Sequence, residues 1–137
     1  MSPDSNDAPL SGVRILFVDD DDDLRDAVVL SLQRYGAIVS PASNGISALE
    51  LFHHLEFDVV LSDMRMPDGD GLFLADSIQK SGRRKPIFII FSGYNDLTPE
   101  MCAESGITET IEKPTTIDEI VRRMCKLIKR SSWRDSE

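Results

Sequence analysis

The sequence has few cysteines, few aromatic side chains and a deficit of basic charge. Its two cysteines, Cys102 and Cys125, are far apart, so neither a zinc site nor a disulfide framework is predicted. Lysine and arginine number 15 against 24 aspartates and glutamates, which gives a formal net charge of -9. This charge argues against direct binding of nucleic acid, which requires a basic surface, and is compatible with a cation site or a basic protein partner.

Long hydrophobic runs are also missing. No stretch approaches the roughly 20 apolar residues of a transmembrane helix, and the N-terminus lacks a signal-peptide pattern, so we expect no membrane insertion and a cytoplasmic location. The 137 residues are enough for one domain. Polar composition predicts a disordered leader over residues 1–11 and a polar tail over 131–137, with the domain in 12–130.

Five apolar segments have the length and composition of buried β-strands, and each is followed by a helical pattern. The predicted strands are residues 14–18, 37–40, 57–61, 87–91 and 107–111, and the predicted helices begin near 21, 45, 72, 95 and 117. The helical pattern is weakest over 95–104, where Pro99 is compatible with a helix only near its first turn. Continuous apolar strands alternating with helices predict an α/β fold, a five-stranded parallel sheet with helices on both faces.

Polar side chains follow the carboxyl ends of these strands. Asp19 and Asp20 follow the first strand, Asp63 the third, Ser92 the fourth and Lys113 the fifth, so a parallel sheet brings them to one edge. Crowded carboxylates repel one another unless a cation lies among them, and Mg²⁺ prefers such oxygen ligands. A carboxylate can also attack phosphorus, while a hydroxyl and an ammonium group bind phosphoryl oxygens.

Taken together, these motifs resemble those of the receiver domain of two-component response regulators. The resemblance covers about residues 13–130 and rests on Val18-Asp19-Asp20, on Asp63 with Met66-Pro67 and Gly71, on Ser92-Gly93, and on Lys113-Pro114, whose peptide bond is often cis in the family. It implies a flavodoxin-like (βα)5 fold with strand order 2-1-3-4-5.

The resemblance also implies roles for the acidic residues and their loop. Asp63 would be the phosphoacceptor and, with Asp20, would bind Mg²⁺ or Mn²⁺ through its side chain. Asp19 would hold waters of the metal, and the backbone carbonyl of Arg65 would supply a further ligand.

Ser92 and Lys113 would contact the phosphoryl group, and Ser92 would also take part in the conformational switch. The second switch position, three residues before the lysine, is usually aromatic in this family. Here it is Thr110. We therefore expect a complete phosphorylation site with an altered route from that site to the surface.

The function implied is a phosphorylation-dependent signalling switch, not an enzyme that turns over a metabolite. The donor would be a histidine kinase or a histidine phosphotransfer protein. The signal would pass to a downstream protein partner or a missing output domain, or act through a phosphorylation-dependent dimer. One alternative is a pseudo-receiver that is never phosphorylated. The other is a haloacid-dehalogenase-like phosphatase, which would carry a second aspartate where this sequence has Arg65.

Overall fold

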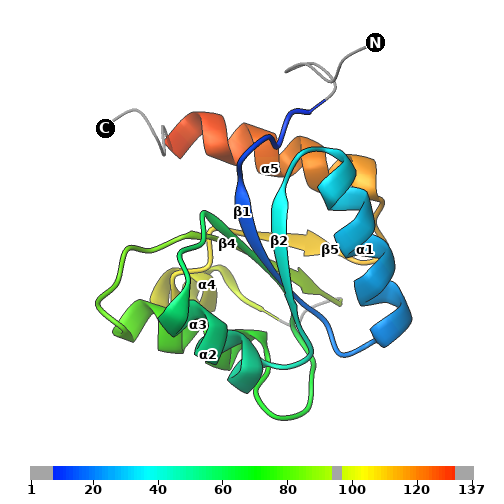
Figure 1. Ribbon diagram of the computed structural model, residues 1–137. Coiled ribbons are helices and arrows are strands. Elements are labelled where there is room, and N and C mark those ends of the chain that lie inside the picture. Colours follow the sequence, from blue (N-terminus) through cyan, green and yellow to red (C-terminus); the bar gives the residue numbers. More distant parts are fainter. Residues whose placement is uncertain (1–7, 94–96, 132–137) are drawn as a thin grey trace.

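The computed structural model describes residues 8–93 and 97–131, in which five strands alternate with five helices (Figure 1). The elements are β1 (Arg14–Val18), α1 (Asp22–Arg34), β2 (Ile38–Ala42), α2 (Gly45–His54), β3 (Val59–Asp63), α3 (Gly71–Lys80), β4 (Ile87–Ser92), α4 (Pro99–Ser105), β5 (Glu109–Glu112) and α5 (Ile117–Ser131). All strand pairs are parallel, in the order β2-β1-β3-β4-β5. The predicted architecture and strand order are confirmed.

The helices begin where short polar side chains can accept a hydrogen bond from the first turn. Asp21, Asn44, Asp70 and Thr98 each cap the helix that follows, by accepting from a backbone N–H three residues on. Helix α4 begins at Pro99, whose missing N–H costs nothing at the first helical position. It is therefore shorter than the predicted segment 95–104, whose first two residues lie outside the described part.

The core has two layers, one on each face of the sheet. Along β1, Ile15 and Phe17 contribute to the layer under α1 and α5, while Leu16 and Val18 contribute to the layer under α2, α3 and α4. Successive strand residues point to opposite faces, so each strand supplies both layers. This arrangement explains why the central strands β1, β3 and β4 are apolar except near their ends, whereas the edge strands β2 and β5 contain polar residues.

The folded domain begins earlier than the predicted boundary at residue 12. Of the predicted leader, residues 1–7 lie outside the described part of the chain. Leu10, however, is fully buried in the core layer of α1 and α5, and its N–H donates to the carbonyl of Tyr35 at 2.9 Å. The buried side chain of Leu10 and the backbone hydrogen bonds of Leu10 and Gly12 to Tyr35 and Gly36 hold this segment beside the end of α1. The predicted tail, residues 131–137, lies outside the described residues except for Ser131.

The end of the sheet opposite the acidic edge contains a buried ion pair that the sequence reading missed. Asp58, whose side chain is 1% exposed, accepts hydrogen bonds from the backbone N–H of Arg14 at 2.9 Å and from the guanidinium groups of Arg14 and Arg84. These contacts join the start of β1 to the segments that precede β3 and β4. None of the helices in residues 8–93 and 97–131 has the length and apolar character needed to cross a membrane.

Candidate functional site

The carboxyl ends of β1 and β3 lie side by side at the point where the strand order reverses. Val18 of β1 pairs with Ser62 of β3, so Asp19 and Asp63 are the next residues along two neighbouring strands. Asp19, Asp20 and Asp63 each place a carboxylate oxygen within 4.8 Å of the others. Ligand sites of open parallel sheets form at such reversal points. The structure therefore brings together the three acidic residues that the sequence singled out.

Asp19 is in an unfavourable electrostatic position for a charged carboxylate. It is 3% exposed, and burial raises the pKa of its carboxyl above the usual value. The N–H of Asp21 donates to Asp19 Oδ1 at 2.9 Å and counteracts this shift, whereas the charge of Asp63 adds to it. Three carboxylates in this space form a donor set that suits a hard divalent cation such as Mg²⁺.

Lys113 contacts the central carboxylate directly. Its ammonium nitrogen lies 2.8 Å from Asp63 Oδ1, which also accepts a hydrogen bond from the N–H of Met64 at 2.9 Å. The N–H of Lys113 donates to the carbonyl of Ser92 at 3.1 Å, and the Lys113–Pro114 peptide bond is cis. Ser92 is the last residue of β4 and is 8% exposed, beside the Phe91 that pairs with Asp63. Ser92 and Lys113 are thus at the same edge as the acidic residues.

Arg65 lies in the loop between β3 and α3, two residues after Asp63, and its side chain is exposed. This position puts its backbone beside the acidic edge.

Arg25 is a site neighbour that the sequence reading missed. Its Nη1 donates to the backbone carbonyl of Asp19 at 2.8 Å, and its Nη2 pairs with Asp22 at 2.7 Å, with only 16% of the arginine side chain exposed. The sequence feature that could have identified it is a single arginine within a run of aspartates at the start of a helix. Arg25 stabilises the turn in which Asp19 and Asp20 lie.

An open, mostly apolar cleft of about 530 Å³ adjoins the site between α1 and the segment joining β5 to α5. Its walls include the side chains of Phe17, Val28, Phe91 and Ile120, and Asp19 and Lys113 also line it. The cleft therefore places an apolar surface next to the charged edge.

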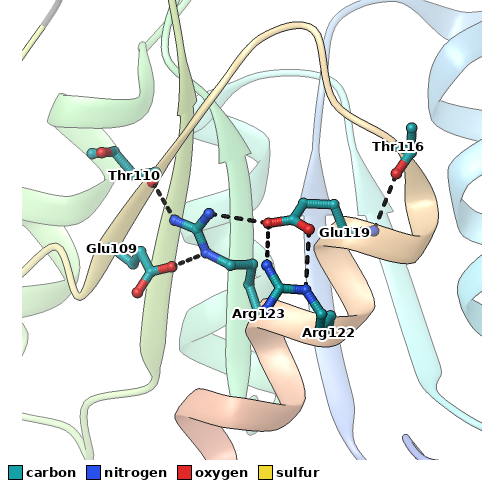
Figure 2. A network of polar contacts seen from close by, with 6 residues as sticks. All are labelled: Glu109, Thr110, Thr116, Glu119, Arg122 and Arg123. Atoms are coloured by element: carbon teal, nitrogen blue, oxygen red, sulfur yellow. Dashed lines mark hydrogen bonds and ion pairs between the residues drawn. The ribbon is translucent and has the colours of Figure 1, made fainter.

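Thr110 lies away from the acidic edge, in the middle of β5 (Figure 2). In a parallel strand, every second residue directs its backbone N–H and C=O to the same side. The N–H of Lys113 points to β4, and Thr110, three residues earlier, points to the opposite side. The backbone of Thr110 consequently faces the open edge of the sheet. There its carbonyl accepts a hydrogen bond from Arg123 Nη2 of α5 at 3.2 Å.

Arg123 also pairs with two carboxylates, Glu109 of β5 and Glu119 of α5 (Figure 2). Its pKa is raised, first by the hydrogen bond to Glu109. Arg123 thus joins the edge strand β5 to α5 and contacts the backbone of Thr110, the residue expected to be aromatic by the resemblance described above.

Replacing Arg123 with alanine should lower the free energy of unfolding by about 1 kcal/mol, because partly buried ion pairs and the bond to the Thr110 carbonyl are lost together. Arg122 is the matched control, since it pairs only with Glu119 among the contacts drawn in Figure 2 and its side chain is 59% exposed. Urea denaturation of both alanine variants measures the difference. Equal losses for the two variants would contradict a special role for Arg123.

Replacing Asp19 with asparagine should stabilise the protein at neutral pH without divalent cations, by about 1 kcal/mol, because one charge leaves the crowded site. The pKa of Asp19 is higher in the folded than in the unfolded protein, so folding favours the protonated carboxyl. This stabilising contribution is complete below the unfolded pKa and is lost as the pH rises through the folded pKa, where Asp19 becomes charged. The gain should therefore vanish in acid. Urea denaturation in EDTA measures it, with the exposed Asp26→Asn as control, and a less stable Asp19→Asn protein would refute the repulsion.

Comparison with known proteins agrees with this geometry. The family model of the response regulator receiver domain matches residues 15–125. Response regulator MprA of Mycobacterium sp. (strain KMS) is 34% identical over 122 residues, which are 88% of this chain and 52% of that protein. The chain thus spans about half the length of this curated relative.

Solved receiver domains show the same arrangement. The receiver domain of Francisella response regulator 1452 is 29% identical and has a TM-score of 0.77, with 88% of this chain and 99% of that chain covered. A response regulator receiver domain protein from Clostridium thermocellum is 27% identical with a TM-score of 0.78, covering 88% and 98%. The chain belongs to the receiver domain family of two-component response regulators.

Proposed function

We propose that this receiver domain is a phosphorylation-dependent switch in which Asp63 accepts a phosphoryl group from a phosphohistidine. The donor would be a histidine kinase or a histidine phosphotransfer protein. The observation that carries this proposal is the 2.8 Å contact between Lys113 and Asp63 beside the carboxylates of Asp19 and Asp20. It places a nucleophilic oxygen and a cation for phosphoryl oxygens in one site.

In the proposed reaction a carboxylate oxygen of Asp63 attacks phosphorus. The new O–P bond forms while the P–N bond to the donor imidazole breaks, and the imidazole takes the electron pair of the P–N bond and leaves as a neutral ring because its second nitrogen already carries a proton. Lys113 then pairs with a phosphoryl oxygen, and the hydroxyl of Ser92 donates to another. The backbone N–H of Lys113 donates a hydrogen bond to the carbonyl of Ser92. A movement of either residue would therefore displace the ends of both β4 and β5.

The carboxylates of Asp20 and Asp63 and the backbone carbonyl of Arg65 would hold Mg²⁺, or Mn²⁺ in its place, with Asp19 acting through water. When bound, the ion neutralises charge on the phosphoryl oxygens. Removing it should prevent phosphoryl transfer, because Asp19 and Asp20 would then repel the incoming phosphate.

The apolar cleft next to Asp19 and Lys113 supports docking of the donor protein there, since a partner seated in it would bring its histidine close to Asp63. The signal would leave through a downstream protein partner or an output domain. Thr110 stands where the family usually has an aromatic side chain, and the contacts of Arg123 with the Thr110 carbonyl and with Glu109 link β5 to α5.

The proposal is tested by incubation with acetyl phosphate and Mg²⁺, followed by intact mass spectrometry. One phosphoryl adduct that EDTA prevents is the expected result. No adduct under any condition would favour the pseudo-receiver. That alternative is weakened because every acidic and lysine position of the site is filled, and the phosphatase alternative because Arg65 replaces the second aspartate.

A further inference from the structure

The start of α2 and the tip of the β3–α3 loop are joined by two backbone hydrogen bonds. The N–H of Gly45 donates to the carbonyl of Gly69 at 2.8 Å, and the N–H of Ile46 donates to the carbonyl of Asp68 at 3.2 Å. The first N–H groups of a helix have no partner within the helix. Here the loop supplies that partner, and we call this pair of bonds the α2 latch.

The latch requires a glycine at position 45. A Cβ atom on Gly45 would lie 2.6 Å from the carbonyl oxygen of Gly69 and 2.8 Å from its carbon. Both atoms belong to the backbone, so the loop itself would have to move. Any side chain on Gly45 therefore separates the helix from the loop.

The loop tip has an unusual backbone conformation where the latch holds it. Asp68 has φ +57°, the one positive value at a non-glycine residue in the described part of the chain, and Gly69 has φ +101°. Aspartate adopts this conformation more readily than most residues other than glycine, and the latch bond to the Asp68 carbonyl helps to hold the loop tip in it.

The other end of the loop is fixed beside the phosphoacceptor. The N–H of Gly71 donates to the carbonyl of Met64 at 2.9 Å, and the N–H of Met64 donates to Asp63 Oδ1 at 2.9 Å. The backbone of Arg65 lies between this fixed base and the latched tip. Its path beside Asp63 is therefore set from both ends.

We infer that Gly45 is a positioning residue for the acidic site, acting through the α2 latch on the backbone of the β3–α3 loop. It touches no reacting atom. Its effect is on where the loop carbonyls lie relative to Asp63, and so on the affinity for a divalent cation. The part of this inference that concerns the cation rests on the function proposed above.

The latch itself is tested by amide hydrogen exchange of the wild-type protein without metal. The amides of Gly45 and Ile46 should exchange at least about tenfold more slowly than those of Ile117 and Asp118, the same two positions of α5. Equal exchange rates would overturn the latch. This measurement needs no variant and therefore holds even where a substitution prevents folding.

The positioning role is tested by calorimetric titration of Mg²⁺ into folded Gly45→Ala and Gly82→Ala. Gly82 is the matched control, because a Cβ there meets nothing within 4 Å although its φ is +78°. Mg²⁺ binding should weaken about tenfold in Gly45→Ala, the size seen when groups that orient metal ligands are changed. It should stay within twofold of wild type in Gly82→Ala.

A second variant, Gly45→Pro, disrupts the latch in two ways, since it adds a side chain and removes the N–H that donates to Gly69. Proline suits the first position of a helix but has no N–H to donate to Gly69, so Mg²⁺ binding should weaken here as well. Wild-type affinity in both Gly45 variants would overturn the inference. A wild-type protein that does not bind Mg²⁺ would instead contradict the proposed function. The exchange rates of the Gly45 and Ile46 amides would still show whether the latch forms.

Discussion

Replacing Asp63 with asparagine should abolish phosphorylation by acetyl phosphate. The amide is nearly the same size as the carboxylate but lacks the anionic oxygen that attacks phosphorus. It also removes the partner of Lys113 and one carboxylate of the acidic site. Intact mass spectrometry over a time course should therefore show a phosphoryl adduct on the wild type and none on Asp63→Asn.

Asp68→Asn is the matched control for this experiment. It makes the same chemical change in the same loop, at an exposed residue whose latch contact is made by the backbone. Asparagine also accepts the left-handed conformation found there. Phosphorylation at the wild-type rate is expected, and an adduct on Asp63→Asn equal to that on Asp68→Asn would contradict the assignment.

Replacing Asp58 with alanine should lower the free energy of unfolding by about 3 kcal/mol. The substitution leaves Arg14 and Arg84 without their shared carboxylate and the backbone N–H of Arg14 without its acceptor. Since the Arg84 side chain is 57% exposed, water recovers part of the loss. Urea denaturation at neutral pH measures the effect, with Glu56→Ala as control, because Glu56 pairs with the same Arg14 but is 69% exposed.

The stabilisation by Asp58 should disappear in acid. Burial acts to raise the pKa of Asp58, but the hydrogen bonds from Arg14 and Arg84, together with the charge of Arg14, outweigh it and leave the pKa below its usual value. A lowered folded-state pKa gives stability that is present above the unfolded pKa, near 4, and is lost as pH falls through the folded value. The difference between wild type and Asp58→Ala should therefore shrink below about pH 4. A difference that stays constant into strong acid would refute the ion-pair explanation.

The fold could be predicted because the three central strands, β1, β3 and β4, are largely apolar on both faces and alternate with segments of helical pattern. The predicted helix start near residue 45 is confirmed, with Asn44 as its cap, whereas the weak pattern over 95–104 did not reveal that α4 begins only at Pro99. Leu10 was missed because one buried side chain in a polar segment gives no periodic pattern. Asp58 was missed because its partners, Arg14 and Arg84, are distant in sequence, and only the three-dimensional structure brings them together.

The residues of the candidate site could be predicted because they follow successive strands, and a parallel sheet brings all strand ends to one edge. The latch at Gly45 could not be predicted in this way, since it depends on backbone groups of a loop 24 residues further along the chain. The link from Arg123 to Thr110 likewise depends on which backbone groups face the open edge of β5. Contacts that involve backbone atoms are difficult to predict from the pattern of side chains in a sequence.

The most direct test is to locate the phosphoryl group. Borohydride reduces an aspartyl phosphate to homoserine, so peptide mapping after treatment identifies the residue that was phosphorylated. We predict homoserine at position 63 alone, dependent on both acetyl phosphate and Mg²⁺. Homoserine at position 19 or 20, or a phosphoryl adduct that survives borohydride on Ser92, would contradict the assignment of Asp63 as the phosphoacceptor.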